Sequence, residues 1–112
     1  MKSKAYRIRT VDDHEATTRT KEIWLANGLE VEAGTNGLHG GDGGHGSRAY
    51  IRITDLGGSD IRFVRESEKS LIMEICGDSE IQSIICAMRF VADHLSDQIK
   101  ELKVKDHEQI KE

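Results

Sequence analysis

The feature that most constrains this fold is a change in the hydrophobic period near residue 79. Before it, apolar and polar residues alternate over short segments such as "KAYRIRTV", which is typical of half-buried β-strands. After it, from Ile81 to Leu102, apolar residues recur at every third or fourth position, which is typical of one face of an amphipathic helix. No proline interrupts either pattern. The sequence therefore predicts a set of strands followed by one long helix.

Six short strands fit the alternating part, residues 4–76, and their short connections favour antiparallel pairing. The strongest turn signal is Asn27-Gly28, between "KEIWLA" and "LEVEA", because this pair tolerates the positive φ angles of a type I′ turn. The polar segment 12–20 is predicted to be a loop. We therefore predict an α+β fold, a single antiparallel sheet of five to six strands with one long C-terminal helix packed on one face.

The predicted helix has a marked start, because Ser79 and Gln82 have the spacing of a capping box. The apolar stripe then predicts a helix over residues 79–103 and a polar tail over residues 104–112. The whole chain, residues 1–112, has the length of one domain.

The helix is predicted to be longer than its sheet is wide. At 1.5 Å per residue it measures roughly 37 Å, whereas six strands span about 24 Å. We expect the half from Ile81 to Val91 to cover the sheet and the outer stripe, Leu95, Ile99 and Leu102, to overhang it. Because exposed apolar stripes are a liability on a monomer, we expect a homodimer assembled through this helix.

Composition excludes several classes of protein. The net charge of −4 disfavours non-specific binding to nucleic acid. No run approaches the ~18 apolar residues of a membrane span, and the N-terminus lacks the apolar core of a secretion signal. The two cysteines, Cys76 and Cys86, lie in apolar segments and are expected to be buried free thiols. These features predict a cytoplasmic protein with no membrane partner.

The glycine-rich loop, residues 34–47, is the most unusual segment, with seven glycines from Gly34 to Gly46. Its "GDGGHG" matches G-x-G-x-x-G, but a strand follows where dinucleotide binding requires a helix. Successive glycine N–H groups can instead form an anion nest, to which a hydroxyl and a guanidinium would add. A mobile hairpin tip without a ligand is the competing interpretation. The candidate ligand-binding residues are Gly41, Gly43, Gly44, His45, Gly46, Ser47, Arg48 and Arg52.

Strand alternation places several arginines on the sheet face opposite the helix. These are Arg7, Arg9, Arg52 and Arg62. They either pair across strands with Glu30, Glu32 and Glu74, or form a basic face that continues from the loop and receives an anionic ligand.

A metal site is a weaker alternative. His39, Asp42 and His45 offer two imidazoles and a carboxylate, with His14 as a possible fourth ligand. Their spacing matches none of the standard zinc signatures, so we expect neither a metal nor another cofactor. His94 is expected to be solvated.

Three functions remain open. The first is a small non-enzymatic binding protein that holds an anionic, phosphate-bearing ligand such as a nucleotide. The alternative is a homo-oligomeric protein-interaction or inhibitor module that docks onto a partner protein and blocks it. The third is a metal-dependent hydrolase using His39, Asp42 and His45. An enzyme is disfavoured, because no nucleophile elbow is present and neither cysteine has a polar neighbour that would lower its pKa.

Overall fold

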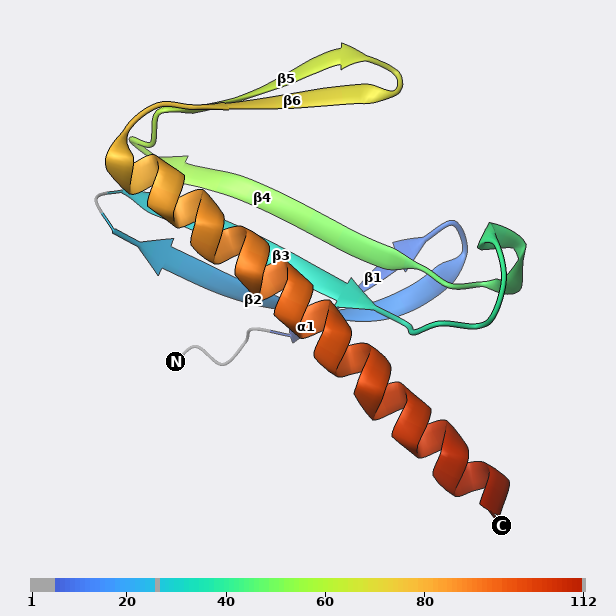
Figure 1. Ribbon diagram of the computed structural model, residues 1–112. Helices are drawn as coiled ribbons and strands as arrows, with labels where there is room; N and C mark the ends of the chain where they lie inside the picture. The colour runs from blue at the N-terminus through green and yellow to red at the C-terminus, as the bar shows by residue number, and fades with distance from the viewer. Residues whose placement is uncertain (1–5, 26, 112) are drawn as a thin grey trace.

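The computed structural model describes residues 6–25 and 27–111, in which six strands precede one helix (Figure 1). The elements are β1 (Tyr6–Val11), β2 (His14–Trp24), β3 (Gly28–Thr35), β4 (Ala49–Gly57), β5 (Ile61–Ser67), β6 (Ser70–Ile75) and α1 (Asp78–Lys111). A short 3₁₀ helix, η2 (Gly43–His45), lies in the glycine-rich loop. The sheet was predicted to begin at residue 4, and its first two residues lie outside the described part.

The strands form two antiparallel sheets. Strands β1 to β4 make a four-stranded sheet in sequence order, and β5 with β6 makes a separate hairpin. The α+β class is therefore confirmed, whereas the single sheet of five to six strands is wrong. The chain turns sharply after β4, where Gly57 and Gly58 adopt φ angles of +133° and +83°. The Cys76 N–H then donates to the Asp60 carbonyl oxygen at 3.0 Å and closes the base of the hairpin.

The first tight turn consists of Asp12 and Asp13, whose φ angles are +48° and +69°. Two successive positive φ angles characterise the type I′ turn, and here they allow Val11 to pair with His14. The prediction of a loop over residues 12–20 is therefore wrong, because β2 begins directly after the turn. Strand pairing on both sides of β2 outweighs the turn preference of its polar residues.

The β2–β3 hairpin forms as predicted, but its turn is displaced. Trp24 pairs with Gly28, so the connection consists of residues 25–27 and Gly28 belongs to the strand. A Cβ atom on Gly28 would collide with the Trp24 ring. Gly28 therefore leaves room for the exposed Trp24 indole to pack on its backbone, and it does not serve a turn that needs a positive φ angle.

The core lies between β3 and α1. Its buried residues are Ile23, Leu29, Val31, Ala33, Ile61, Ala87 and Val91. Ala33 and Ala87, one on each partner, let the helix approach the sheet closely. Gln98 of α1 also fixes the helix to the sheet. Its side chain accepts from the Thr35 N–H at 2.9 Å and donates to the Thr17 carbonyl at 2.8 Å.

The helix is longer than predicted. It begins at Asp78, one residue before the expected start, and its backbone stays helical to Lys111, through most of the predicted tail. Gly77 precedes it with a φ angle of +114°, and the Gly77 carbonyl accepts the N–H of Ile81. Among the described residues, no helix combines the length and apolar character that a membrane span requires.

The apolar positions of α1 are covered differently from the prediction. Leu95, Ile99 and Leu102 are half-buried, because the chain's own glycine-rich loop lies against them. A Cβ atom on Gly37 would lie 3.1 Å from the Leu102 side chain. The expectation that a partner chain must cover this outer stripe is therefore wrong.

The exposed part of the stripe lies nearer the start of the helix. Its residues are Ile81, Ile85 and Met88, which are 48%, 43% and 43% exposed. The N-terminal half of α1 does cover the sheet, as predicted. The side that faces the sheet, however, is that of Ser83, Ala87 and Val91.

The close approach of β2 and β3 generates a stability prediction. A Cβ atom on Gly34 would lie 2.6 Å from the Thr18 Cα, whereas one on Gly43 would meet nothing within 4 Å. We expect Gly34→Ala to lower the free energy of unfolding by about 1–3 kcal/mol, since backbone must move to relieve the overlap. The matched control, Gly43→Ala, should stay within about 0.5 kcal/mol of the parent. Urea denaturation measures both, and equal stabilities would contradict the packing described.

Candidate functional site

The glycine-rich loop is closed by a hydrogen-bonded neck. Asn36 and Arg48 exchange two bonds, from the Asn36 N–H to the Arg48 carbonyl (3.1 Å) and from the Arg48 N–H to Asn36 Oδ1 (2.7 Å). Asn36 Nδ2 also donates to the Gly46 carbonyl at 2.9 Å, and Thr35 Oγ1 to the Arg48 carbonyl at 2.8 Å. The loop is therefore an ordered element, which weakens the interpretation as a mobile hairpin tip.

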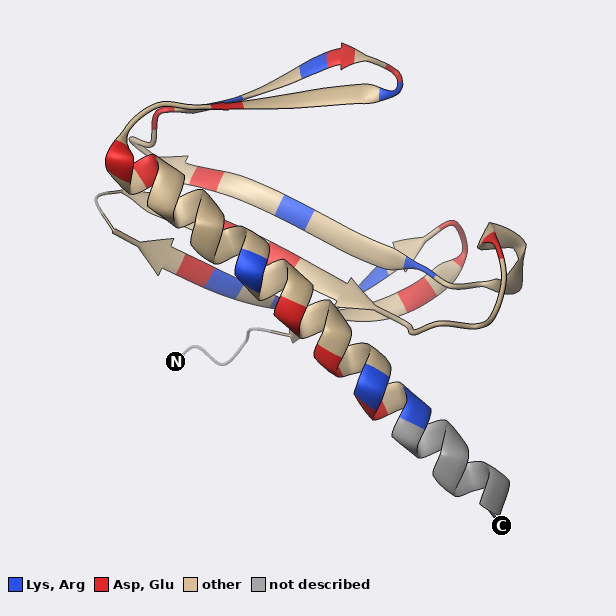
Figure 2. Ribbon diagram, viewed as in Figure 1, with Lys and Arg blue, Asp and Glu red and all other residues tan. Residues whose placement is uncertain are grey.

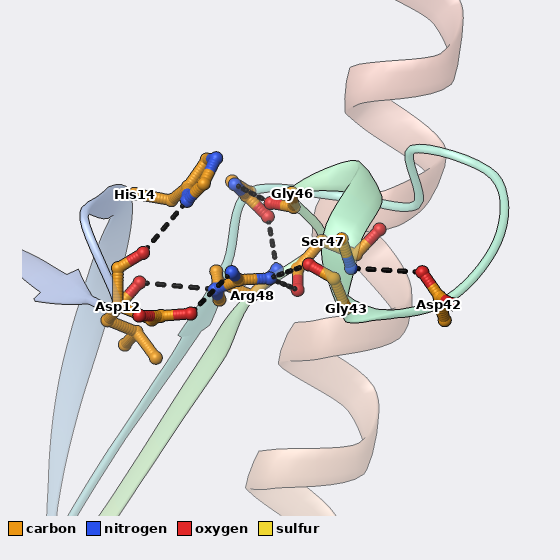
Figure 3. A network of polar contacts seen from close by, with 10 residues as sticks. Asp12, His14, Asp42, Gly43, Gly46, Ser47 and Arg48 are labelled. Carbon is orange, nitrogen blue, oxygen red and sulfur yellow. Dashed lines mark hydrogen bonds and ion pairs between the residues drawn. The ribbon is translucent and has the colours of Figure 1, made fainter.

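Arg48 connects this loop to the β1–β2 turn (Figure 3). Its Nη1 donates to the Gly43 and Ser47 carbonyls at 2.7 and 2.9 Å, and its Nε donates to the Val11 carbonyl at 3.2 Å. Its Nη2 pairs with Asp12 Oδ2 at 2.9 Å, and the side chain is only 12% exposed. All three guanidinium nitrogens are thus bonded to the chain itself, and they hold the loop against the β1–β2 turn. These contacts are here called the Arg48 latch.

Asp42 occupies the place that an anion was expected to take. Its Oδ1 accepts the N–H of Gly44 at 3.0 Å and its carbonyl accepts the N–H of His45 at 3.0 Å, so it caps η2. The N–H of Gly46 is bonded to the Gly43 carbonyl. Three successive amides of the predicted nest are therefore satisfied within the loop.

Only one of the two described loop histidines, His45, meets Asp42. His45 Nδ1 lies 3.3 Å from Asp42 Oδ1, whereas the His39 ring is bonded to the Asn36 carbonyl at 3.0 Å. His14 and His39 both approach Gly46. Within residues 6–25 and 27–103, whose side chains are described, no three His, Cys, Asp or Glu groups are arranged to hold a metal ion.

Most of the predicted arginine set is engaged in ion pairs. Arg9 forms two bonds to Glu32, 2.6 Å from Nε and 2.7 Å from Nη2, and stacks over the Tyr50 ring at 5.0 Å. Arg7 lies 3.8 Å from the same carboxylate. These contacts favour the cross-strand interpretation over a basic ligand face.

The other two arginines lie apart from this cluster. Arg62 belongs to the separate hairpin, where it pairs with Glu74 at 2.8 Å, so the four arginines do not share one sheet face. Arg52 lies opposite Glu32 in the β3–β4 register.

Glu32 is the polar centre of this sheet face. It is 1% exposed and also accepts a bond from Thr18 Oγ1 at 2.5 Å. The hydrogen bonds from Arg9 lower the pKa of the Glu32 carboxyl, against the opposing effect of burial. This carboxylate therefore stabilises the fold above its unfolded pKa, and the contribution is lost as the pH falls through the lower folded value.

A cavity of about 480 Å³, which sequence patterns did not indicate, lies between α1 and β2. Tyr6, Arg19, His94 and Gln98 are among its lining residues. His94 stacks on Phe90 with a centroid distance of 5.5 Å, and its Nε2 is buried without a partner among the described atoms. The expectation of a solvated His94 is wrong. His94 follows Val91 by three residues and Ala87 by seven, and this helical spacing from two buried residues could have indicated that it is partly buried.

The remaining candidate is a surface of exposed apolar side chains on three elements. These are Ile51 of β4, Phe63 and Leu71 of the β5–β6 hairpin, and Ile81, Ile85 and Met88 of α1, here called the apolar surface. Between Glu80 and Arg89 the helix carries no charged residue, as Figure 2 shows. Sequence analysis missed this surface, because it expected the helical residues from Ile81 to Val91 to cover the sheet.

Cys76 and Cys86 are free thiols, as expected, but Cys76 is exposed and Cys86 is only partly covered. The expectation that both are buried is therefore wrong: Cys76 is exposed directly after Ile75, which packs against the core.

Comparisons of this chain with protein-family models, curated proteins and solved structures found no significant match.

The Arg48 latch generates the second prediction. We expect Arg48→Ala to lower the free energy of unfolding by about 2 kcal/mol, since hydrogen bonds to a charged group contribute roughly 1.5–3 kcal/mol. Amides of residues 36–48 should also exchange faster. Arg52→Ala is the matched control and should change stability by less than about 0.5 kcal/mol. An Arg48→Ala protein with the parent's stability and loop protection would contradict the latch.

The third prediction concerns His94. Burial, and then the nearby Arg19, lower the pKa of its imidazole. Because the unfolded chain binds this proton more readily, stability is intact above about pH 6.5 and is lost as the pH falls through the lower folded value. We expect His94→Gln to flatten the stability profile below about pH 6.5. Denaturation across this range measures it, with His39→Gln as control; an unchanged slope in His94→Gln would contradict the assignment.

Proposed function

We propose that this chain is a non-enzymatic protein-interaction module that assembles as a homodimer through the apolar surface. The observation that supports it is the exposure of six large apolar side chains, one on β4, two on the hairpin and three on α1. Monomeric proteins rarely leave such patches uncovered, and rotational two-fold pairing is the simplest way to bury one. The dimer predicted from the sequence is retained, but its contact moves from Leu95, Ile99 and Leu102 to Ile81, Ile85 and Met88.

Helical spacing supports a packing role for these three residues. Ile81, Ile85 and Met88 follow one another at intervals of four and three, so they form a single row on the surface of α1. Such a row packs well against a second apolar element. Charged residues bound this row, with Glu80 at one end and Arg89 at the other.

The anionic-ligand function has weaker support. Arg48 donates to the chain's own carbonyls and to Asp12, and Asp42 occupies the amide-rich part of the loop. A ligand would have to displace these contacts. Nucleotide binding, docking onto a further partner and a cytoplasmic location remain predictions, and no specific contact favours the hydrolase.

The experiment is light scattering coupled to size exclusion. We expect the parent to have twice the 12.5 kDa chain mass. An Ile85→Asp, Met88→Asp double variant should be a folded monomer, because burying the two charges would cost several kcal/mol. Gln82→Asp is the matched control on the same helix, outside the row, and should remain dimeric. A monomeric parent at high micromolar concentration would overturn the proposal.

A further inference from the structure

The β5–β6 hairpin lacks the cover that its composition requires. One of its faces carries Phe63, Leu71 and Met73, of which Met73 packs partly against the core, and the other carries Val64 and Ile72. Leu71 is 71% exposed, and Phe63 and Val64 are 42% and 41% exposed. A two-stranded hairpin is marginally stable alone in water, and apolar residues on both faces are typical of strands inside a larger sheet. The hairpin therefore needs a neighbouring strand and a covering layer.

The four-stranded sheet has an unpaired edge that could receive another strand. β4 is an edge strand, with β3 as its neighbour among the described strands, and a long free edge invites pairing with another chain. Ile51, on the face of β4 that carries the helix, is 53% exposed. This edge therefore offers backbone groups and apolar cover for an incoming strand.

The exposed row of α1 lies on the β4 side of the helix. Leu95 and Ile99 line one cavity together with Ala49, the first residue of β4. At 100° per residue, Ile81 and Met88 project close to the direction of Ile99. The row thus stands beside the free edge of β4, where it would cover an added strand.

The chain's own hairpin is held away from this position. Glu80 Oε2 accepts from both the Asp60 N–H and Asn27 Nδ2 at 3.2 Å, which ties the start of β5 to the first turn of α1. Together with the positive φ angles of Gly57 and Gly58, this directs the hairpin away from β4, as Figure 1 shows.

We propose that two copies of the chain exchange their β5–β6 hairpins, so that each β5 pairs with the free edge of the other copy's β4. This inference rests on the proposed homodimer and specifies its interface. One two-fold operation then covers both unsatisfied surfaces, the hairpin of one copy and the edge and helical row of the other. Phe63 and Met73 come to lie beneath Ile81 and Ile85 of the other copy.

Charge complementarity supports the pairing of β5 with β4 in one particular register. If Gly57 and Ile61 form the closing pair, as in a direct antiparallel connection, then Arg52 lies opposite Glu66 and Thr54 opposite Val64. The Arg52 guanidinium gains a carboxylate partner from the other copy, and opposite charges at facing positions stabilise a strand pair. Val64 is placed beside the β-branched Thr54, which also favours pairing.

Disulfide trapping between differently tagged copies tests the exchange. In a Cys76→Ser, Cys86→Ser background, one copy carries Thr54→Cys and the other Val64→Cys. Directly opposed residues on adjacent strands lie close enough for a disulfide. We expect mild oxidation to give the mixed covalent dimer, whereas Thr54→Cys with Lys69→Cys, at the hairpin tip, should give little.

The outcomes separate this inference from the proposed function. If light scattering gives a dimer but the 54–64 disulfide does not form, the exchange is wrong and the homodimer stands. If a chain carrying both substitutions forms the disulfide internally at monomer mass, its own hairpin closes onto β4 and the exchange is again wrong. A monomeric parent overturns both proposals.

Discussion

The packing of α1 on β3 is the contact on which the rest of the structure depends. It joins the buried residues Leu29, Val31 and Ala33 to Ala87 and Val91 of the helix. Small side chains at its centre bring the two elements close together, and Gln98 fixes the helix to the sheet by hydrogen bonds in both directions. Because a helix can present only one side to a sheet, this contact determines which other apolar residues remain at the surface.

Two consequences follow from the orientation of the helix. Its C-terminal half lies against the glycine-rich loop, which Arg48 and Asn36 hold in an ordered conformation. Its N-terminal half leaves Ile81, Ile85 and Met88 beside an unpaired strand edge and a hairpin that stands apart. The polar groups of the ordered loop are bonded within the chain, whereas the side chains of the apolar surface remain uncovered. This contrast is why we propose protein interaction over ligand binding.

Sequence patterns predicted the elements better than their arrangement. The change of period at residue 79 identified the helix and the α+β class, because periodicity reports local conformation directly. The same pattern cannot separate two apolar sides of one helix, so Ile85 was assigned to the core. Likewise Arg48 and Asp42 had the chemistry of an anion site, but their partners are backbone groups that residue spacing does not reveal. The Asp12-Asp13 turn was missed because its positive φ angles depend on pairing between β1 and β2.

Residue-resolved amide hydrogen exchange, measured at low and high protein concentration, distinguishes the hairpin-exchanged dimer from a monomer. We expect the β4 amides pointing away from β3, and the β5 amides pointing away from β6, to become protected together as the dimer forms. The same protection should be absent from Ile85→Asp, Met88→Asp at either concentration. Outward β4 amides that exchange without protection at every concentration, in a parent that is otherwise fully folded, would contradict this dimer.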